Sequence, residues 1–77
     1  LLAGPFTGTI LGYFGAEVIK VEPPEGGDPI RSWRETRDGV SFWWRSIARN
    51  KKCVTLDLRT PRGRELMTEL AARADVF

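Results

Sequence analysis

The 77-residue chain contains few of the side chains that carry out covalent or acid/base catalysis. It has a single cysteine, Cys53, and no histidine. Disulfide frameworks, zinc sites built from cysteine and histidine, and every triad or general base that uses histidine are therefore excluded within this chain. Carboxylates remain, but no two of them form a dyad that spacing alone identifies. The sequence therefore predicts no catalytic residue and no metal ligand.

Cys53 follows Lys51 and Lys52 and begins a run of strand-like residues. The two lysines could lower the pKa of its thiol, but a small side chain in a strand is more often buried. We therefore expect a buried structural cysteine. A lone cysteine also fits a reducing compartment, which predicts a cytoplasmic protein.

Charge is distributed unevenly along the sequence, although the formal net charge is only +2. Residues 1–30 hold one base against four acids, whereas the stretch from Arg45 to Arg64 holds seven bases and one acid. Such a segregated basic stretch creates a local positive field. It is suited to a phosphorylated partner.

Aromatic and basic residues are interleaved between residues 30 and 52, where the aromatic members are Trp33, Phe42, Trp43 and Trp44. This composition is typical of platforms that stack single-stranded nucleic acid and neutralise its phosphates. No RRM, KH or helix-turn-helix pattern accompanies it. We expect the tryptophans to anchor a long loop instead, so nucleic acid is not the expected partner.

Four glycines near the start of the chain invite a nucleotide site, and they are Gly4, Gly8, Gly12 and Gly15. Their spacing matches neither the G-x-G-x-x-G fingerprint nor a P-loop. We expect them to allow close packing of a helix on a sheet. Glu22, placed where a ribose ligand would be, is expected to be a solvated strand end.

Local signals predict an alternation of helices and strands. Pro5 and Thr60-Pro61 mark helix starts, Gly15 marks a helix end, and Pro23-Pro24 ends a strand. The expected elements are a helix at 5–14, a strand at 17–22, a long loop at 23–47 with a short helix near 41–48, a strand at 53–58, a helix that begins at 61, and the start of a third strand at 75–77.

This order is that of one half of an open α/β sheet, so the predicted fold class is α/β. No apolar run approaches the roughly 20 residues of a membrane span, and we expect no membrane partner. A chain of 77 residues buries only about 60% of its unfolded surface. We therefore expect the chain to be part of a longer protein.

Ordered blocks of the sequence resemble the N-terminal region of the family III CoA-transferases, which include formyl-CoA transferase and carnitine CoA-transferase. The blocks cover nearly the whole chain apart from residues 32–47. They are Leu2-Ala3-Gly4-Pro5-Phe6, Leu11-Gly12, the run from Gly15 to Pro24, Gly27-Asp28-Pro29 with Arg31, Arg49-Asn50-Lys51-Lys52, Leu56-Asp57-Leu58, Pro61-x-Gly63-Arg64 and Ala74-Asp75-Val76.

The resemblance implies a large Rossmann-like domain whose first strand lies just before Leu1, and a homodimer of two interlocked rings. Residues 1–77 are then a partial N-terminal α/β segment that binds coenzyme A. The resemblance also implies transfer of CoA from an acyl-CoA donor to a carboxylic acid through covalent intermediates on an aspartate. That aspartate lies beyond residue 77 in the family. The related racemases of the same fold are one alternative, and a small basic module that binds CoA or single-stranded nucleic acid is another.

The resemblance carries CoA contacts over to six positions only. They are Leu2 and Ala3, just before the Gly-Pro turn, and Leu56, Asp57, Leu58 and Arg59 at the end of the predicted second strand. Arg59 is expected to meet a phosphate or the adenine of CoA, with a solvated arginine before a helix cap as the alternative. Formyl-CoA transferase has a glutamine in place of Leu2 and an arginine in place of Pro23, which argues against formyl or oxalate specificity.

Overall fold

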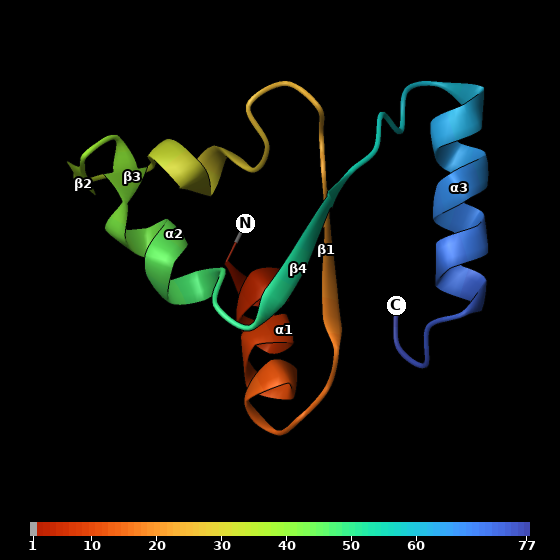
Figure 1. Cartoon of the computed structure of the whole chain (residues 1–77), viewed down its shortest axis with the longest axis horizontal. Coiled ribbons are helices and arrows are strands. Elements are labelled where there is room, and N and C mark those ends of the chain that lie inside the picture. Colours follow the sequence, from red (N-terminus) through yellow and green to blue (C-terminus); the bar gives the residue numbers. More distant parts are fainter. Residues whose placement is uncertain (1) are drawn as a thin grey trace.

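The computed structural model describes residues 2–77. Its elements are α1 (Ala3–Tyr13), β1 (Val18–Glu22), the 3-10 helix η1 (Pro29–Ser32), β2 (Thr36–Arg37), β3 (Val40–Ser41), α2 (Phe42–Ile47), β4 (Lys51–Thr55) and α3 (Pro61–Ala72), as Figure 1 shows. The predicted α/β class is confirmed.

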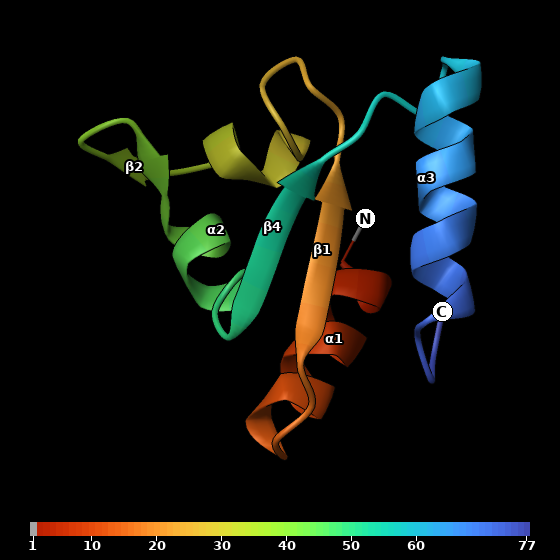
Figure 2. The ribbon, with the colours of Figure 1, turned by 45° about the vertical axis from the view of Figure 1, so that its right-hand side comes forward.

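The central sheet consists of β1 and β4, which run parallel to each other. Val18 lies opposite Lys51 at one end of the ladder, and Glu22 lies opposite Thr55 at the other. Figure 1 views this sheet nearly edge-on, with α2 and η1 on one side of it and α3 on the other. Figure 2 shows the two strands side by side, with both arrowheads at the same end. The loops that follow β1 and β4 therefore leave the sheet at one common edge.

Helix α1 packs closely on the amino-terminal half of the sheet because two of its residues have no side chain. A Cβ atom on Gly8 would lie 3.3 Å from Val18, and one on Gly12 would lie 3.2 Å from Asn50. The prediction of close helix packing is confirmed for these two glycines. Gly15 has a φ of 100°, a conformation that side chains disfavour, and it turns the chain from α1 into β1.

The second predicted strand was misplaced, because β4 covers Lys51–Thr55 rather than 53–58. It begins earlier because Lys51 already pairs with Val18. It ends earlier because β1 is followed by Pro23, which has no N–H to continue the ladder. The N–H of Leu56 still donates to the carbonyl of Glu22 at 3.0 Å, and the chain then turns away.

The predicted third strand at 75–77 is wrong, since these residues form no strand in the structure. Strands need a neighbour to accept and donate backbone hydrogen bonds, and none of residues 2–77 lies beside this segment as a strand. Val76 is 72% exposed and Phe77 is 92% exposed. Helix α3 before it is as expected, with the Thr60 hydroxyl accepting the N–H of Gly63 at 3.0 Å.

The expected long loop at 23–47 contains more structure than its composition predicted. It holds η1, the two-stranded antiparallel β2–β3 hairpin and α2, of which only α2 was expected. Ser41 caps α2 by accepting the N–H groups of Trp43 and Trp44. Ile30 and Ile47 are the buried apolar side chains that fasten this region to the rest. Among the described residues, no helix has the length and apolar character required to cross a membrane.

Candidate functional site

The candidate site lies at the carboxyl end of the β1–β4 sheet. Parallel sheets bind their ligands at this end, where the loops after the strands meet. The loop after β4 contains Leu56, Asp57, Leu58 and Arg59, the four downstream residues that the sequence predicted. Leu56 and Asp57 are half-buried, whereas Leu58 and Arg59 are exposed.

The turn from β4 into α3 is tightly braced by its own hydrogen bonds. The hydroxyl of Thr60 donates to the carbonyl of Asp57 at 2.8 Å while it caps α3. Nη1 of Arg64 donates to the carbonyls of Leu58 and Arg59, at 3.1 Å and 3.0 Å. A Cβ atom on Gly63 would collide with the carbonyl of Asp57, so glycine is required there. These contacts hold the position of the Arg59 backbone.

The guanidinium of Arg59 is hydrogen-bonded to Asp57 through Nε and Nη2, and its Nη1 is open. Its Nε and its backbone N–H both donate to Oδ1 of Asp57, each at 3.0 Å. The Asp57 carboxylate raises the pKa of Arg59, and Arg59 in turn holds the pKa of Asp57 below its usual value. Its side chain is 72% exposed, and among residues 2–77 no acceptor bonds to Nη1. A guanidinium in this state presents free N–H donors to an external anion.

Leu2 and Ala3 lie at the amino end of α1. Leu2 precedes the helix, is half-buried, and accepts the N–H of Phe6 at its carbonyl at 2.9 Å. Ala3 is the first helical residue and is exposed. No hydrogen bond or ion pair within the described chain joins these two residues to Leu56–Arg59. The four downstream candidates thus lie in one turn, and the two upstream candidates lie at the start of α1.

Glu22 is the residue at this edge that sequence reasoning placed wrongly, because it is buried rather than solvated. It is 4% exposed and forms a two-pronged ion pair with Arg31, with Nε to Oε2 at 2.8 Å and Nη2 to Oε1 at 2.7 Å. The N–H of Asp28 also donates to Oε2, at 2.7 Å. The hydrogen bonds from Arg31 lower the pKa of Glu22 to about 2. The turn-forming Gly-Gly-Asp-Pro sequence between Glu22 and Arg31 was the sequence feature that could have indicated that the chain folds back and brings these two side chains together.

This ion pair, together with Lys20 and Asp28, forms what we call the loop clamp (Lys20, Glu22, Asp28 and Arg31). Nζ of Lys20 lies 2.6 Å from Oδ2 of Asp28, whose Oδ1 accepts the N–H of Ile30 at 2.9 Å. The guanidinium of Arg31 also stacks 3.7 Å from the centre of the Trp44 ring. The clamp fixes the loop after β1 to the sheet.

The aromatic contacts of the 30–52 segment lie within that segment, and Phe42 and Trp43 are exposed, so the anchoring of this loop by its tryptophans stays a prediction. The rings of Trp33 and Trp43 lie 5.5 Å apart in a tilted arrangement, and Arg34 lies over Trp33 at 4.7 Å. Trp44 is the platform for Arg31. The rings of Trp33, Trp43 and Trp44 thus each contact another side chain of this chain.

Cys53 corrects a further expectation, since it is exposed on β4 and not buried. It is opposite Lys20 in the ladder, and the sheet edge beside β4 carries no covering strand among residues 2–77. Partial desolvation and the neighbouring Glu22 carboxylate raise the pKa of the thiol, so the adjacent lysines do not activate it.

Among residues 2–77, no group of three or more histidine, cysteine, aspartate or glutamate side chains is placed to hold a metal ion.

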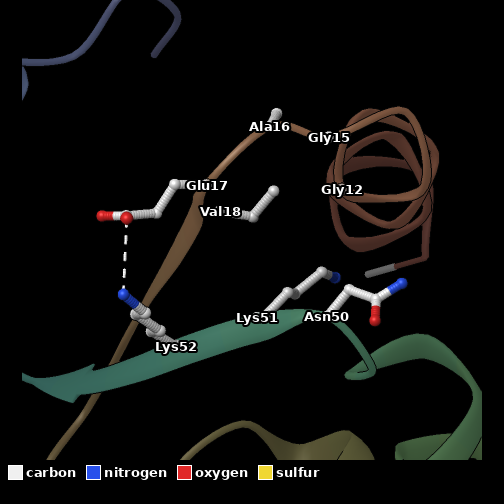
Figure 3. A pocket seen from close by; sticks show the side chains of 8 residues that line it. All are labelled: Gly12, Gly15, Ala16, Glu17, Val18, Asn50, Lys51 and Lys52. Carbon is white, nitrogen blue, oxygen red and sulfur yellow. Dashed lines mark hydrogen bonds and ion pairs between the residues drawn. The ribbon is translucent and has the colours of Figure 1, made fainter.

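A hollow lies at the opposite, amino end of the strands (Figure 3). Its two ammonium groups are already engaged: Lys52 with Glu17 at 3.3 Å, and Lys51 with the carbonyl of Pro5 at 2.5 Å. Figure 3 shows Lys51 directed toward α1 rather than into the opening. Burial lowers the pKa of Lys51. This hollow is a packing feature of α1, and the carboxyl end remains the candidate site.

Comparison with known proteins identifies the family. A family model described as "CoA-transferase family III" matches residues 1–77. The chain belongs to this family. The chain is 55% identical over 76 residues to succinyl-CoA–D-citramalate CoA-transferase of Chloroflexus aurantiacus, a match that covers 97% of this chain and 19% of the relative.

Two further relatives show how widely the match extends. Human succinyl-CoA:glutarate CoA-transferase is 46% identical over 78 residues, which covers 100% of this chain and 18% of the relative. Formyl-CoA:oxalate CoA-transferase of Bradyrhizobium sp. (strain ORS 278) is 40% identical over 76 residues, 97% of this chain and 18% of the relative. The chain thus spans about a fifth of the length of the curated relatives it matches.

Proposed function

We propose that the protein containing this chain transfers coenzyme A from an acyl-CoA donor to a carboxylic acid acceptor. The match of the CoA-transferase family III model to all of residues 1–77 carries this proposal. The reaction passes through an acyl anhydride and a CoA thioester on an enzyme aspartate that lies outside these residues. Covalent catalysis of this kind divides one difficult exchange into easier steps. The chain described here contributes to substrate binding and supplies no catalytic residue.

Within this function, the turn after β4 and the start of α1 hold the CoA moiety. Leu2, Ala3, Leu56, Asp57 and Leu58 line the site, and Arg59 binds a phosphate of CoA. The open edge of the Arg59 guanidinium and its fixed backbone support this role. The positive stretch from Arg45 to Arg64 adds a favourable field for an anionic substrate.

The chain is, on this proposal, the N-terminal α/β segment of a Rossmann-like domain. The parallel pairing of β1 with β4 supports it, because such sheets place successive strands side by side and add a first strand on the other edge of β1. We further propose an interlocked homodimer in the cytoplasm, where the single thiol of Cys53 stays reduced.

The activity is tested by incubating the intact protein with succinyl-CoA and a panel of carboxylic acids, and by identifying the acyl-CoA products by mass spectrometry. Succinyl-CoA is the first donor to try, because two relatives carry it in their names. A new acyl-CoA that forms at the expense of the donor would support the proposal. Exchange of the proton next to the thioester carbonyl, without CoA transfer, would favour a racemase instead.

The CoA contact is tested by Arg59→Ala in the intact protein. Loss of a charge-assisted hydrogen bond at a solvated site predicts CoA binding that is weaker by about five- to tenfold, measured by calorimetry. Arg62→Ala is the matched control, because Arg62 is 65% exposed and pairs with Glu65 at 3.2 Å. Equal affinity in the two variants would leave Arg59 as a plain surface residue.

A further inference from the structure

Arg59 connects the two loops at the carboxyl end of the sheet. Its Nε donates to Asp57, in the loop after β4, and its Nη2 lies 3.6 Å from Oε1 of Glu25, in the loop after β1. One guanidinium therefore faces two carboxylates that come from different strand ends. Any anion that approaches Arg59 meets both of them.

The two carboxylates hold Arg59 with different strength. Asp57 is two residues away, accepts both the side-chain and the backbone N–H of Arg59, and its side chain is only 32% exposed. Glu25 makes a single longer contact, beyond hydrogen-bond distance, and its side chain is 85% exposed. Exposed ion pairs of this kind contribute little stability and are readily broken. Asp57 thus orients the guanidinium, whereas Glu25 is displaceable.

Glu25 weakens the attraction of this edge for an anionic ligand while it is in place. It adds a second carboxylate beside the Arg59 guanidinium, which Asp57 already pairs. When Glu25 moves away, that negative charge is removed and Nη2 of Arg59 loses its contact on the side of the loop after β1. Release of Glu25 from Arg59 requires no rearrangement of the turn after β4. Glu25 lies in the separate Pro-Pro-Glu-Gly-Gly segment, whereas that turn is held by Thr60 and Arg64.

We propose that Glu25 is an internal competitor that tunes the affinity of this edge for a phosphate-bearing ligand by occupying Arg59 until the ligand displaces it. This inference rests on the proposed function, which supplies coenzyme A as that ligand. Glu25 is then a positioning residue that acts through Arg59, and it makes no favourable contact with the substrate. Its removal strengthens binding, which a residue that merely supports the fold would not do.

The experiment compares CoA affinity of the intact protein with that of its Glu25→Gln variant by calorimetry. Loss of a competing exposed ion pair and of one nearby negative charge predicts binding that is tighter by about two- to fivefold. Glu65→Gln is the matched control, because Glu65 is also exposed and paired, at 3.2 Å with Arg62. It should change the affinity by less than about 1.5-fold. The gain in Glu25→Gln should shrink as NaCl rises from about 0.05 M to about 0.5 M.

The double variant Glu25→Gln/Arg59→Ala separates the possible outcomes. If Glu25 acts through Arg59, Glu25→Gln has no effect on CoA affinity in the Arg59→Ala background. An equal gain in both backgrounds, an equal gain in Glu65→Gln, or unchanged affinity in Glu25→Gln would overturn the inference while leaving CoA binding intact. Failure of the wild-type protein to bind CoA would overturn the proposed function together with the inference.

Discussion

Residues 2–55, the sheet unit, and residues 56–77, the C-terminal arm, are held together in different ways. The sheet unit depends on contacts between residues far apart in sequence. The hydroxyl of Thr9 donates to the carbonyl of Ile47 at 2.6 Å, and Glu22 pairs with Arg31 at 2.7 Å. The arm depends mainly on near neighbours, because most of its caps and ion pairs join residues six or fewer positions apart. It also reaches the sheet unit through the Leu56 N–H, which donates to the carbonyl of Glu22 at 3.0 Å, and through the exposed contact of Arg59 with Glu25 at 3.6 Å. Both views show α3 standing apart from the sheet (Figures 1 and 2).

The two regions therefore differ in how much they depend on contacts with other parts of the chain. Local capping places the arm's turn and helix correctly without a tertiary partner. It does not bury the apolar face of α3, where Leu66, Met67, Leu70 and Ala71 remain only half-buried. Among residues 2–77, every buried side-chain nitrogen or oxygen atom has a hydrogen-bond partner, and in the sheet unit several of these partners are distant in sequence. The predictions below test this division between local and long-range stabilisation.

The largest effect is expected when residues 1–77 are produced alone. We predict a poorly ordered or aggregated chain, because two strands with few covering side chains do not form an independently stable sheet. The exposed Phe14 and Phe77, at 85% and 92%, add to its tendency to associate. Calorimetry and amide NMR spectra measure whether the isolated chain is ordered. A sharp cooperative melt with dispersed amide signals would contradict the prediction and would show that the sheet unit needs no further chain.

Within the intact protein, Glu22→Gln should destabilise the sheet unit most, by about 3 kcal/mol, because it leaves Arg31 without its buried partner. The folded pKa of Glu22 is about 2, below its usual value of 4.5. The stabilisation is therefore present above pH 4.5 and is lost as pH falls toward 2.

Urea unfolding at several pH values checks this expectation. The Glu22→Gln variant should lose less stability between pH 4.5 and pH 2 than the wild-type protein does. Glu17→Gln is the control, because Glu17 is 66% exposed and lies 3.3 Å from Lys52. Parallel acid curves for wild type and Glu22→Gln would mean that the clamp adds nothing to stability.

The smallest effect is expected in the arm. Thr60→Ala removes the cap of α3 and should cost about 1 kcal/mol. Because the arm is stabilised locally, hydrogen exchange should accelerate in the first turn of α3 and stay unchanged in β1 and β4. Thr68→Ala is a suitable control, since the Thr68 hydroxyl bonds only within the helix, to the carbonyl of Arg64. Faster exchange across β4 in Thr60→Ala would show that arm and sheet unit are coupled.

Features that depend on neighbouring residues could be predicted from the amino-acid sequence. Thr60-Pro61 and Gly15 placed the helix boundaries, because caps, proline and positive φ obey local rules. Ordered sequence blocks indicated the family, and the family match agrees with them. They placed Leu56, Asp57 and Leu58 in a strand, however, whereas the structure has these residues in the turn after β4.

The pairing of residues that are distant in sequence became apparent in the folded structure. The fold ended β4 at Thr55, because the partner strand stops at Glu22, and it left residues 75–77 without a ladder. It buried Glu22 against Arg31, nine residues away across a turn, where composition alone indicated a solvated charge. It also set Glu25 beside Arg59. These outcomes depend on which groups come into contact in the folded chain. The local sequence of a strand end or a carboxylate is the same whether or not a distant residue pairs with it.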